Sequence, residues 1–174
     1  MNAKEAMKIG REVMEQMNFR FDMLILNDDD ERTGLVALDE CNMLHLNVPL
    51  HNALGIVQTA ITFEDNYVDV RTFPDPILVD VNDRDQCLRI IESLNIINAY
   101  IKMGRYYLDI DSGDIALWTR IQYWALEKLP ETLTEAVITQ YEYYEDLGET
   151  IMGCVNGTIS VLEARSLIAE KWNE

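Results

Sequence analysis

The sequence predicts an α+β fold, an antiparallel sheet with helices packed on one face. Apolar residues recur at intervals of three and four in four segments, which is the spacing of amphipathic helices. In the segments between them apolar and polar residues alternate, and the connections are short, so the strands are expected to pair antiparallel. The predicted order is helix, meander, helix, hairpin, helix and an extra C-terminal helix, in a single domain over residues 1–174.

The N-terminal helix is predicted over residues 3–17, where methionine and small residues form one stripe at helical spacing. Asn2 is suited to cap this helix, with Glu5 as its reciprocal partner three residues on. Residues 19–25 then alternate in the manner of a half-buried strand. Two short apolar runs, whose pairing the sequence leaves open, follow at residues 35–38 and 43–50.

A clearer hairpin is predicted from residues 55–63 and 67–73. The connection between them is short and contains Asn66, a residue that tolerates the positive φ of a tight turn. Pro74 and Pro76 follow the second strand and end it, because proline cannot donate to a central ladder. The inward face of this hairpin is expected to consist of Val57, Thr59, Ile61, Phe63, Val68, Val70 and Thr72.

A long helix is predicted over residues 84–103, capped by Asp83 and ended by Gly104. One of its apolar faces suits a sheet. A second apolar strip lies roughly opposite and consists of Leu88, Ile96, Ala99 and Met103. A helix on a sheet needs one apolar face only, so this strip is a candidate dimer or partner surface, the alternative being cover by the chain's own C-terminal helix.

A second hairpin is predicted from residues 105–110 and 115–124 around a turn at 111–114. One face of its strands is rich in the aromatic and arginine side chains that interfaces favour. Such side chains also occur on a sheet face that a helix covers, so both interpretations stay open. The candidate interface residues here are Tyr107, Trp118, Arg120 and Trp124.

Two capping boxes are predicted in the C-terminal third. Thr132 with Glu135 opens one helix, which Gly157 ends, and Ser160 with Glu163 opens the last. That final helix, at about residues 158–172, is either part of the domain or an appendage to it.

Charge excludes several function classes. The chain has 31 acidic residues against 14 Lys and Arg, a net charge of −17, so we expect neither nucleic-acid nor membrane-surface binding. The N-terminus lacks the apolar stretch of a signal peptide, and no window is apolar enough to cross a membrane. Three widely spaced cysteines suggest reduced thiols, and together these features predict a cytoplasmic protein.

No constellation of catalytic or metal-binding residues is recognisable. Cys41, His45 and His51 form an incomplete zinc set with an unusual spacing. Residues 109–114 resemble a calcium loop, but glycine stands in the fifth place instead of the sixth and strands flank the segment, so a hairpin turn is favoured. Phosphate-binding loops, nucleophile elbows and zinc-protease motifs are missing from the sequence. We therefore expect no cofactor and no enzymatic activity.

Several segments together resemble the YbjN-like domain, a bacterial group that shares the fold of type III secretion chaperones. They are Thr72-Phe73-Pro74, Leu94-Asn95-Ile96-Ile97-Asn98, Lys102-Met103-Gly104-Arg105-Tyr106-Tyr107-Leu108-Asp109 and Asp111-Ser112-Gly113-Asp114-Ile115. The resemblance covers roughly residues 3–155. The chain departs from the family in having a longer stretch at residues 28–54 and an additional helix after Gly157. The resemblance implies an α+β domain that tends to dimerise and that, in its secretion-chaperone relatives, binds protein segments. It does not imply a catalytic site.

The leading hypothesis is therefore a non-enzymatic, protein-binding or chaperone-like homodimer whose negative charge favours basic partners. The alternative is a small-molecule or metal-binding regulatory domain that uses residues 28–54 as a lid. A hydrolytic enzyme ranks third, because its polar residues would have to converge from distant parts of the chain.

Overall fold

The computed structural model describes residues 1–24 and 41–172, which contain one six-stranded antiparallel sheet. The strand order is β1-β2-β3-β4-β6-β5. The neighbouring strands are β1 (Asp22–Leu24), β2 (Met43–Pro49), β3 (Ile56–Phe63), β4 (Tyr67–Asp75), β6 (Ile115–Gln122) and β5 (Arg105–Leu108). The runs at 43–50 and 55–63 thus pair with each other, a pairing that the sequence left open.

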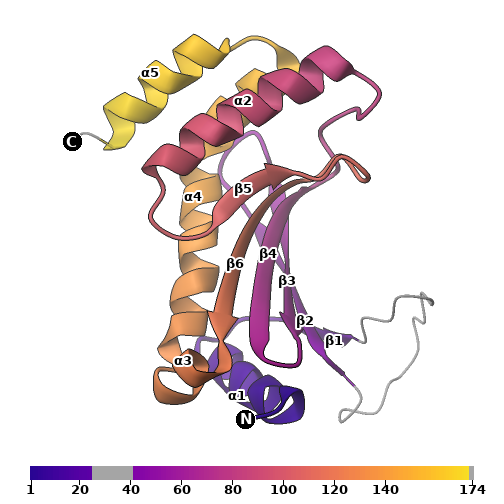
Figure 1. Cartoon of the computed structure of the whole chain (residues 1–174), viewed down its shortest axis with the longest axis vertical. Coiled ribbons are helices and arrows are strands. Elements are labelled where there is room, and N and C mark those ends of the chain that lie inside the picture. The colour runs from indigo at the N-terminus through magenta and orange to yellow at the C-terminus, as the bar shows by residue number, and fades with distance from the viewer. Residues whose placement is uncertain (25–40, 173–174) are drawn as a thin grey trace.

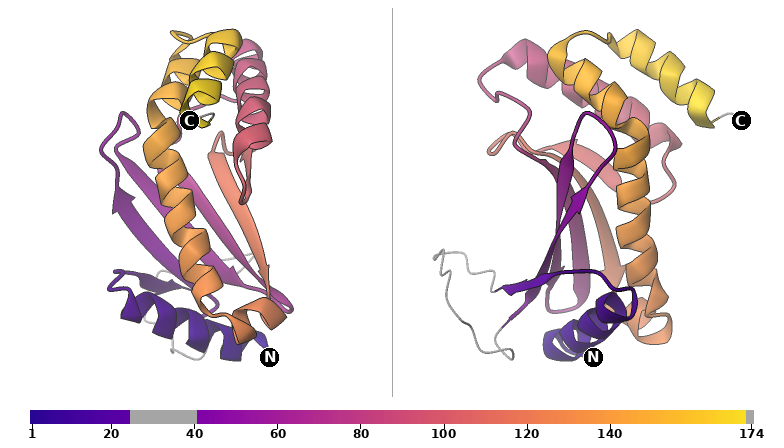
Figure 2. Two further views of the ribbon diagram at one scale, coloured as in Figure 1. Left: turned by 90° about the vertical axis from the view of Figure 1, so that its left-hand side faces the viewer. Right: turned by 180° about the vertical axis from the view of Figure 1, so that it is seen from behind.

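The described residues also form five helices: α1 (Ala3–Gln16), α2 (Arg84–Tyr100), α3 (Tyr123–Lys128), α4 (Glu131–Asn156) and α5 (Val161–Trp172). The long helix α4 runs along one face of the sheet, which we call the inner face (Figure 2). Helix α1 lies at one end of the molecule, and α2 and α5 lie together at the other (Figure 1). The predicted α+β class, with helices on one face of an antiparallel sheet, is confirmed.

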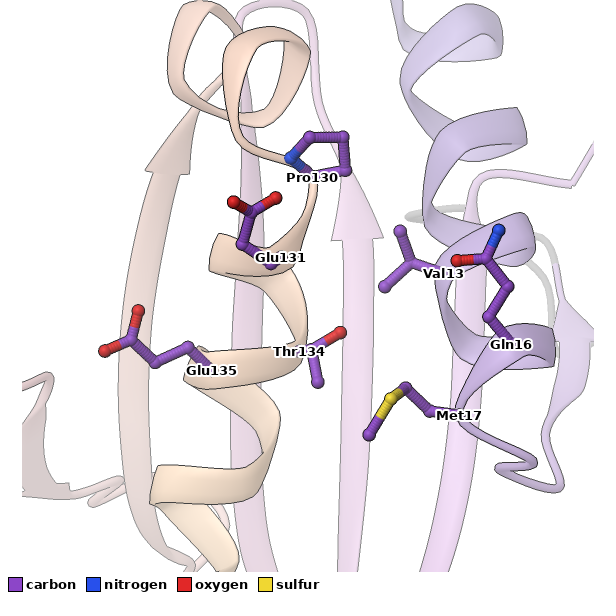
Figure 3. Close-up of a pocket in the computed structure, with 7 residues that line it drawn as sticks. All are labelled: Val13, Gln16, Met17, Pro130, Glu131, Thr134 and Glu135. Carbon is purple, nitrogen blue, oxygen red and sulfur yellow. The ribbon is translucent and has the colours of Figure 1, made fainter.

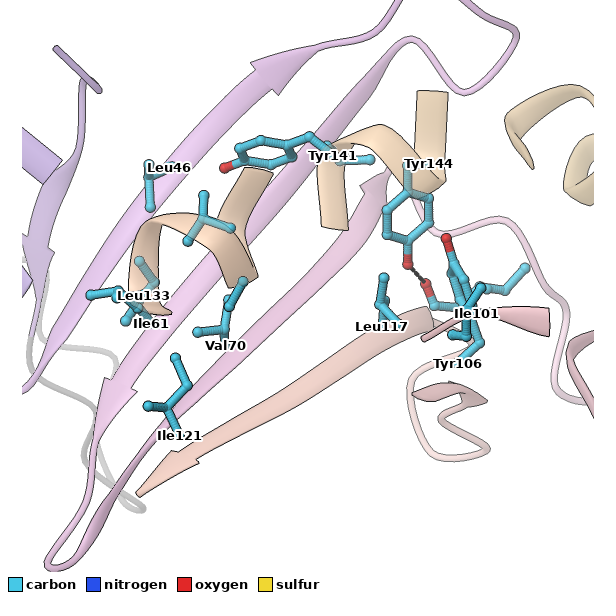
Figure 4. Packing of buried hydrophobic residues seen from close by; sticks show 14 of the residues in the cluster. Leu46, Ile61, Val70, Ile101, Tyr106, Leu117, Ile121, Leu133, Tyr141 and Tyr144 are labelled. Carbon is cyan, nitrogen blue, oxygen red and sulfur yellow. Dashed lines mark hydrogen bonds between the residues drawn. The ribbon is translucent and has the colours of Figure 1, made fainter. Parts of the chain in front are cut away.

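The inner face has the alternation that the sequence predicts. Ile61 of β3 stands opposite Val70 of β4, and both are fully buried. Helix α4 covers them with a stripe of large side chains that includes Leu133 and Tyr144 (Figure 4). Burial of each such side chain stabilises the fold by about 1.5–3 kcal/mol before conformational entropy is counted.

A polar layer crosses this core. The Tyr144 hydroxyl lies 2.8 Å from the carbonyl oxygen of Thr72 and 2.6 Å from that of Ile115. The amide of Gln140 donates to the Val70 carbonyl at 3.1 Å. Tyr106 packs edge-on against Tyr144, with ring centroids 5.2 Å apart (Figure 4). Polar side chains of α4 thus hold the helix in register on the sheet, because Tyr144 and Gln140 reach these strand carbonyls in one register only.

Two of the three predicted capping boxes are present. Asn2 and Glu5 exchange hydrogen bonds at the start of α1, and Ser160 and Glu163 do so at the start of α5. The box at Thr132 is wrong. Helix α4 begins at Glu131, directly after Pro130, whose φ of −54° already suits a helix. The Thr132 hydroxyl does not cap the helix and donates to the Leu129 carbonyl instead.

Other predicted boundaries also change, and strand β4 continues through Pro74 to Asp75 instead of ending at residue 73. Strand β6 ends at Gln122, not at residue 124, because Tyr123 turns away to hydrogen-bond the β3–β4 turn through its backbone N–H, at Asn66, and its hydroxyl, at Glu64. The chain then forms the short helix α3. Helix α2 ends at Tyr100 and not at residue 103. The backbone at Ile101 is extended, and the Ile101 side chain is buried in the core.

Helix α2 closes one edge of the sheet. The side chain of Asn98 donates to the Tyr106 carbonyl at 2.8 Å and accepts from the Tyr106 N–H at 2.7 Å. It therefore occupies the outward backbone groups of Tyr106, which β5, as an edge strand, would otherwise offer to another chain. At the other end of α2, Arg89 donates to the carbonyls of Cys154 and Val155, which lie in the last turn of α4.

Candidate functional site

The opposite side of the sheet, here called the outer face, has no described helix on it (Figure 2). Strand register places aromatic and charged side chains there. The charged residues that the strands contribute to this face are Asp22, Asp69, Asp75, Arg71, Arg105 and Arg120. Three positive and three negative side chains balance, whereas the chain as a whole carries a charge of −17.

The centre of the outer face is a stacked cluster around Arg120. The guanidinium binds both carboxylate oxygens of Asp69, at 2.8 and 2.9 Å, and lies 3.6 Å from the ring centroid of Tyr67. The Trp118 ring lies 4.8 Å away. The hydrogen bonds that Arg120 donates to the Asp69 carboxylate raise the pKa of Arg120, so the cation persists over the whole accessible pH range. Paired bonds and stacking hold the side chain in one orientation, which lowers the entropy that a partner would have to remove.

The structure brings together three of the four predicted hairpin residues. Trp118 and Arg120 lie on β6, and Tyr107 lies on β5 opposite Ala116, all on the outer face. Trp124 does not join them, because the strand ends before it, and it stands 65% exposed on α3. The sequence analysis missed Tyr67 and Asp69, although alternation along β4 puts them on the same face as Arg71.

The second strip on the long helix is divided. Leu88 is 47% exposed and Ala99 is exposed as well. Ile96 and Met103 are partly buried and pack against the core of the same chain. Helix α5 lies alongside α2 (Figure 1), so the C-terminal helix supplies intrachain cover to one side of it. Only part of the strip therefore stays open to a partner.

A groove between α1 and α4 was not apparent from the sequence (Figure 3). It has a volume of about 540 Å³ and is open to solvent. Val13 and Met17 form one wall, and Pro130 and Thr134 form the other, with Glu131 and Glu135 at the rim. The two walls belong to helices about 115 residues apart in sequence, an order of separation that local periodicity does not reveal.

The residues considered for zinc binding have other roles. His45 lies 3.3 Å from the side-chain oxygen of Gln58, and His51 lies 2.8 Å from Glu145, while Cys41 is buried. In the described ranges, 1–24 and 41–172, no three His, Cys, Asp or Glu side chains are placed to hold a metal ion. Burial raises the pKa of the Cys154 thiol, which keeps it protonated and weakly nucleophilic.

Residues 109–114 form the predicted hairpin turn. The Asp109 carboxylate accepts from the backbone N–H of Asp111, and the Gly113 N–H bonds the Asp109 carbonyl at 2.7 Å. Gly113 has a φ of 86° and lies against the Val79 carbonyl, so a side chain would fit neither its backbone nor its surroundings. The carboxylate that a calcium loop would use is thus engaged by the turn itself.

The proposed lid at 28–54 is described in its second half only. There, the loop after β2 is fastened to α4: Asn52 donates to the carbonyls of Tyr144 and Glu145, and the Ala53 N–H donates to Glu149. Gly148 leaves the space that Asn52 fills. The acidic run at 27–31 and the apolar run at 35–38 lie outside the described residues.

Comparison with known proteins leaves the family open: no family model, curated protein or solved structure matches this chain. The resemblance to YbjN-like domains therefore stays a prediction. Among the described residues, no helix is both long and apolar enough to cross a bilayer.

Proposed function

We propose that this chain is a non-enzymatic protein-binding domain that forms a homodimer through the outer face of its sheet. The observation that carries the proposal is the charge balance of that face, three arginines against three aspartates in a chain of net charge −17. A symmetric dimer brings each patch against its own copy, so a surface with excess charge repels itself and a balanced one does not.

The composition of the outer face also supports contact with protein. Tyr67, Trp118 and Arg120 belong to the residue types that dominate binding energy at interfaces. Their mutual stacking and the clamp from Asp69 present them as a preformed surface. Two sheets packed face to face would place these side chains in the layer of about 10 Å between them.

Leu88 and Ala99 support a smaller role. They are the exposed members of the strip on α2, while Ile96 and Met103 already pack on the core. Two exposed residues fall short of the contact area that a stable dimer needs, about 800 Å² from each partner. They therefore add little to the homodimer proposal, which rests on the outer face.

Family and location belong to the same proposal. A YbjN-like, chaperone-like domain accounts for the order of elements and for an interaction role. A cytoplasmic location accounts for the odd number of cysteines.

Light scattering after size exclusion tests the dimer. We expect about twice the monomer mass of 20.1 kDa at micromolar concentration. Arg71→Glu, on the outer face, removes the charge balance there and is expected to weaken the dimer at least tenfold. Arg165→Glu on α5 changes the net charge equally and serves as the matched control, with no expected effect. A wild-type monomer, or equal effects of the two substitutions, contradicts the proposal.

The groove between α1 and α4 favours one second candidate, a regulatory domain that binds a small molecule. A thermal-shift screen with metabolites tests it. The expected signature is a rise in Tm that saturates at micromolar ligand and disappears in Thr134→Trp, which fills the groove. A screen without such a ligand removes this candidate and leaves the dimer proposal untouched.

A further inference from the structure

One end of the molecule exposes several large aliphatic side chains. Ile77 is 58% exposed in the connection between β4 and α2, and Ile110 is 67% exposed in the β5–β6 turn. Leu88 and Ile91 are exposed on the first half of α2, and Val81 is exposed just before it. We call these five residues the aliphatic end. Single exposed aliphatic residues are common, but a group of them indicates an interaction site.

Contacts between the segments show that they meet. Gly113 of the β5–β6 turn abuts Val79 and Ile77. The thiol of Cys87 on α2 points to the carbonyls of Asp80 and Val81. Because Asn98 ties α2 alongside β5, the first half of α2 continues past the β5–β6 turn, and two views show the turn, the connection and the start of α2 at the same end (Figures 1 and 2).

Aspartates surround the aliphatic end. Residues 75–85 and 109–114 contain one basic residue, Arg84, against seven aspartates, all at least partly exposed: Asp75, Asp80, Asp83, Asp85, Asp109, Asp111 and Asp114. None of the ion pairs within residues 1–24 and 41–172 neutralises them. Several accept hydrogen bonds from backbone N–H groups, as Asp83 does from Asp85 and Gln86. These bonds fix the loops and leave the charge in place.

This charge decides which occupant fits. A second copy of the chain would bring seven aspartates against seven, so self-association is opposed here, in contrast to the balanced outer face. A metal ion is not favoured either, because the described carboxylates do not converge in a group of three. We propose that the aliphatic end binds a basic amphipathic segment of another protein, with apolar side chains on the aliphatic residues and lysine or arginine against the aspartates.

The test uses the full chain and a fluorescein-labelled 14-residue peptide of leucine and lysine, patterned as an amphipathic helix. A leucine and glutamate peptide of the same pattern is the reference. We expect saturable binding of the lysine peptide by fluorescence anisotropy, weakening as salt rises. Ile110→Ser and Leu88→Ser should each raise Kd roughly tenfold, because each removes an apolar contact from a different element. Asp85→Asn and Asp111→Asn should each raise it severalfold.

Matched controls separate this surface from general attraction to an acidic protein. Leu162→Ser removes a 75% exposed leucine on α5, and Glu142→Gln removes an exposed carboxylate on α4. Neither should change Kd. Absence of binding, or equal losses in the controls, overturns the proposal. Conversion of a dimer to a monomer by Ile110→Ser overturns it too, because the aliphatic end would then be a contact between copies. The outer-face variant Arg71→Glu should bind the peptide normally, so the two proposals fail independently.

Discussion

The inner and outer faces of the sheet are made by the same strands but differ in how their polar groups are satisfied and in how far solvent reaches them. On the inner face, polar groups reach backbone carbonyls, as Tyr144 does at Thr72, and water is excluded by α4. On the outer face, polar groups pair with one another, as Arg120 does with Asp69, and remain partly accessible. Adjacent residues in a strand thus lie either in the core or on the partly accessible outer face, and substitutions on the two faces should have different effects.

The largest difference is expected between Leu117 and Arg71. Leu117 is fully buried on the inner face, and Leu117→Ala should lower the free energy of unfolding by about 2–5 kcal/mol through lost burial and a cavity. Arg71 is exposed on the outer face of a single subunit, so Arg71→Ala, measured at a protein concentration low enough to dissociate the proposed dimer, should stay within about 0.5 kcal/mol of the wild type. Urea denaturation followed by circular dichroism measures both. Similar losses for the two variants would show that the outer face is covered as well.

A finer contrast lies within the core. Tyr144→Phe removes a hydroxyl that bridges two buried carbonyls, and we expect a loss of about 1–2 kcal/mol. The neighbouring Tyr106 hydroxyl is buried and finds no hydrogen-bond partner among the described residues, so Tyr106→Phe should be neutral or stabilising. Both substitutions remove one oxygen and preserve the ring contact. If Tyr106→Phe costs as much as Tyr144→Phe, the hydroxyl of Tyr106 has a partner in solution, and the polar layer extends further than described.

Alkaline pH should destabilise the fold through buried tyrosines, and Tyr141 on α4 is one of them. Burial raises the pKa of Tyr141 to about 12 from an unfolded value of 10.0. A raised pKa means that the folded state favours the neutral phenol. The stability that comes from burying neutral Tyr141 is therefore complete below pH 10 and is lost as pH rises from 10 towards 12. The loss should be on the order of 1 kcal/mol by pH 11. Urea unfolding between pH 8 and 11 should show a steeper decline for the wild type than for Tyr141→Phe. Parallel declines would mean that Tyr141 is solvated.

Elements that depend on neighbours in sequence were predictable. The capping boxes at Asn2 and Ser160 could be predicted because each involves residues three apart in sequence. The β3–β4 hairpin could be predicted from alternation along its strands and from its short connection. The box at Thr132 failed because Pro130, two residues earlier, provides an alternative start to the same helix. Where two local signals compete, the sequence alone does not decide between them, because tertiary context can override local propensity.

Features that depend on distant residues were predictable in part. Trp118 and Arg120 were recognised because they alternate on one strand, but Asp69, the ion-pair partner of Arg120, lies 51 residues away. Tyr123 starts a helix because it bonds a turn that lies far back in the sequence. The strip on α2 is divided because α5 and the core cover Ile96 and leave Leu88 exposed. In each case the missing information was which elements become neighbours, and periodicity within one element does not contain it.

The smallest effect is expected at the Arg120–Asp69 pair, and it distinguishes the outer face from a second core. Asp69 is 6% exposed and Arg120 is 37% exposed, so solvent screens the pair from one side. At a protein concentration low enough to dissociate the proposed dimer, a double-mutant cycle with Asp69→Asn and Arg120→Gln should give a coupling free energy of about 0.5–1 kcal/mol, reduced in 1 M salt. The parallel cycle at Asp146 and Lys171, both exposed, should give less. A coupling of several kcal/mol at Asp69 that ignores salt would show instead that the pair is buried in solution. In that case another part of the same chain covers the outer face within a single subunit.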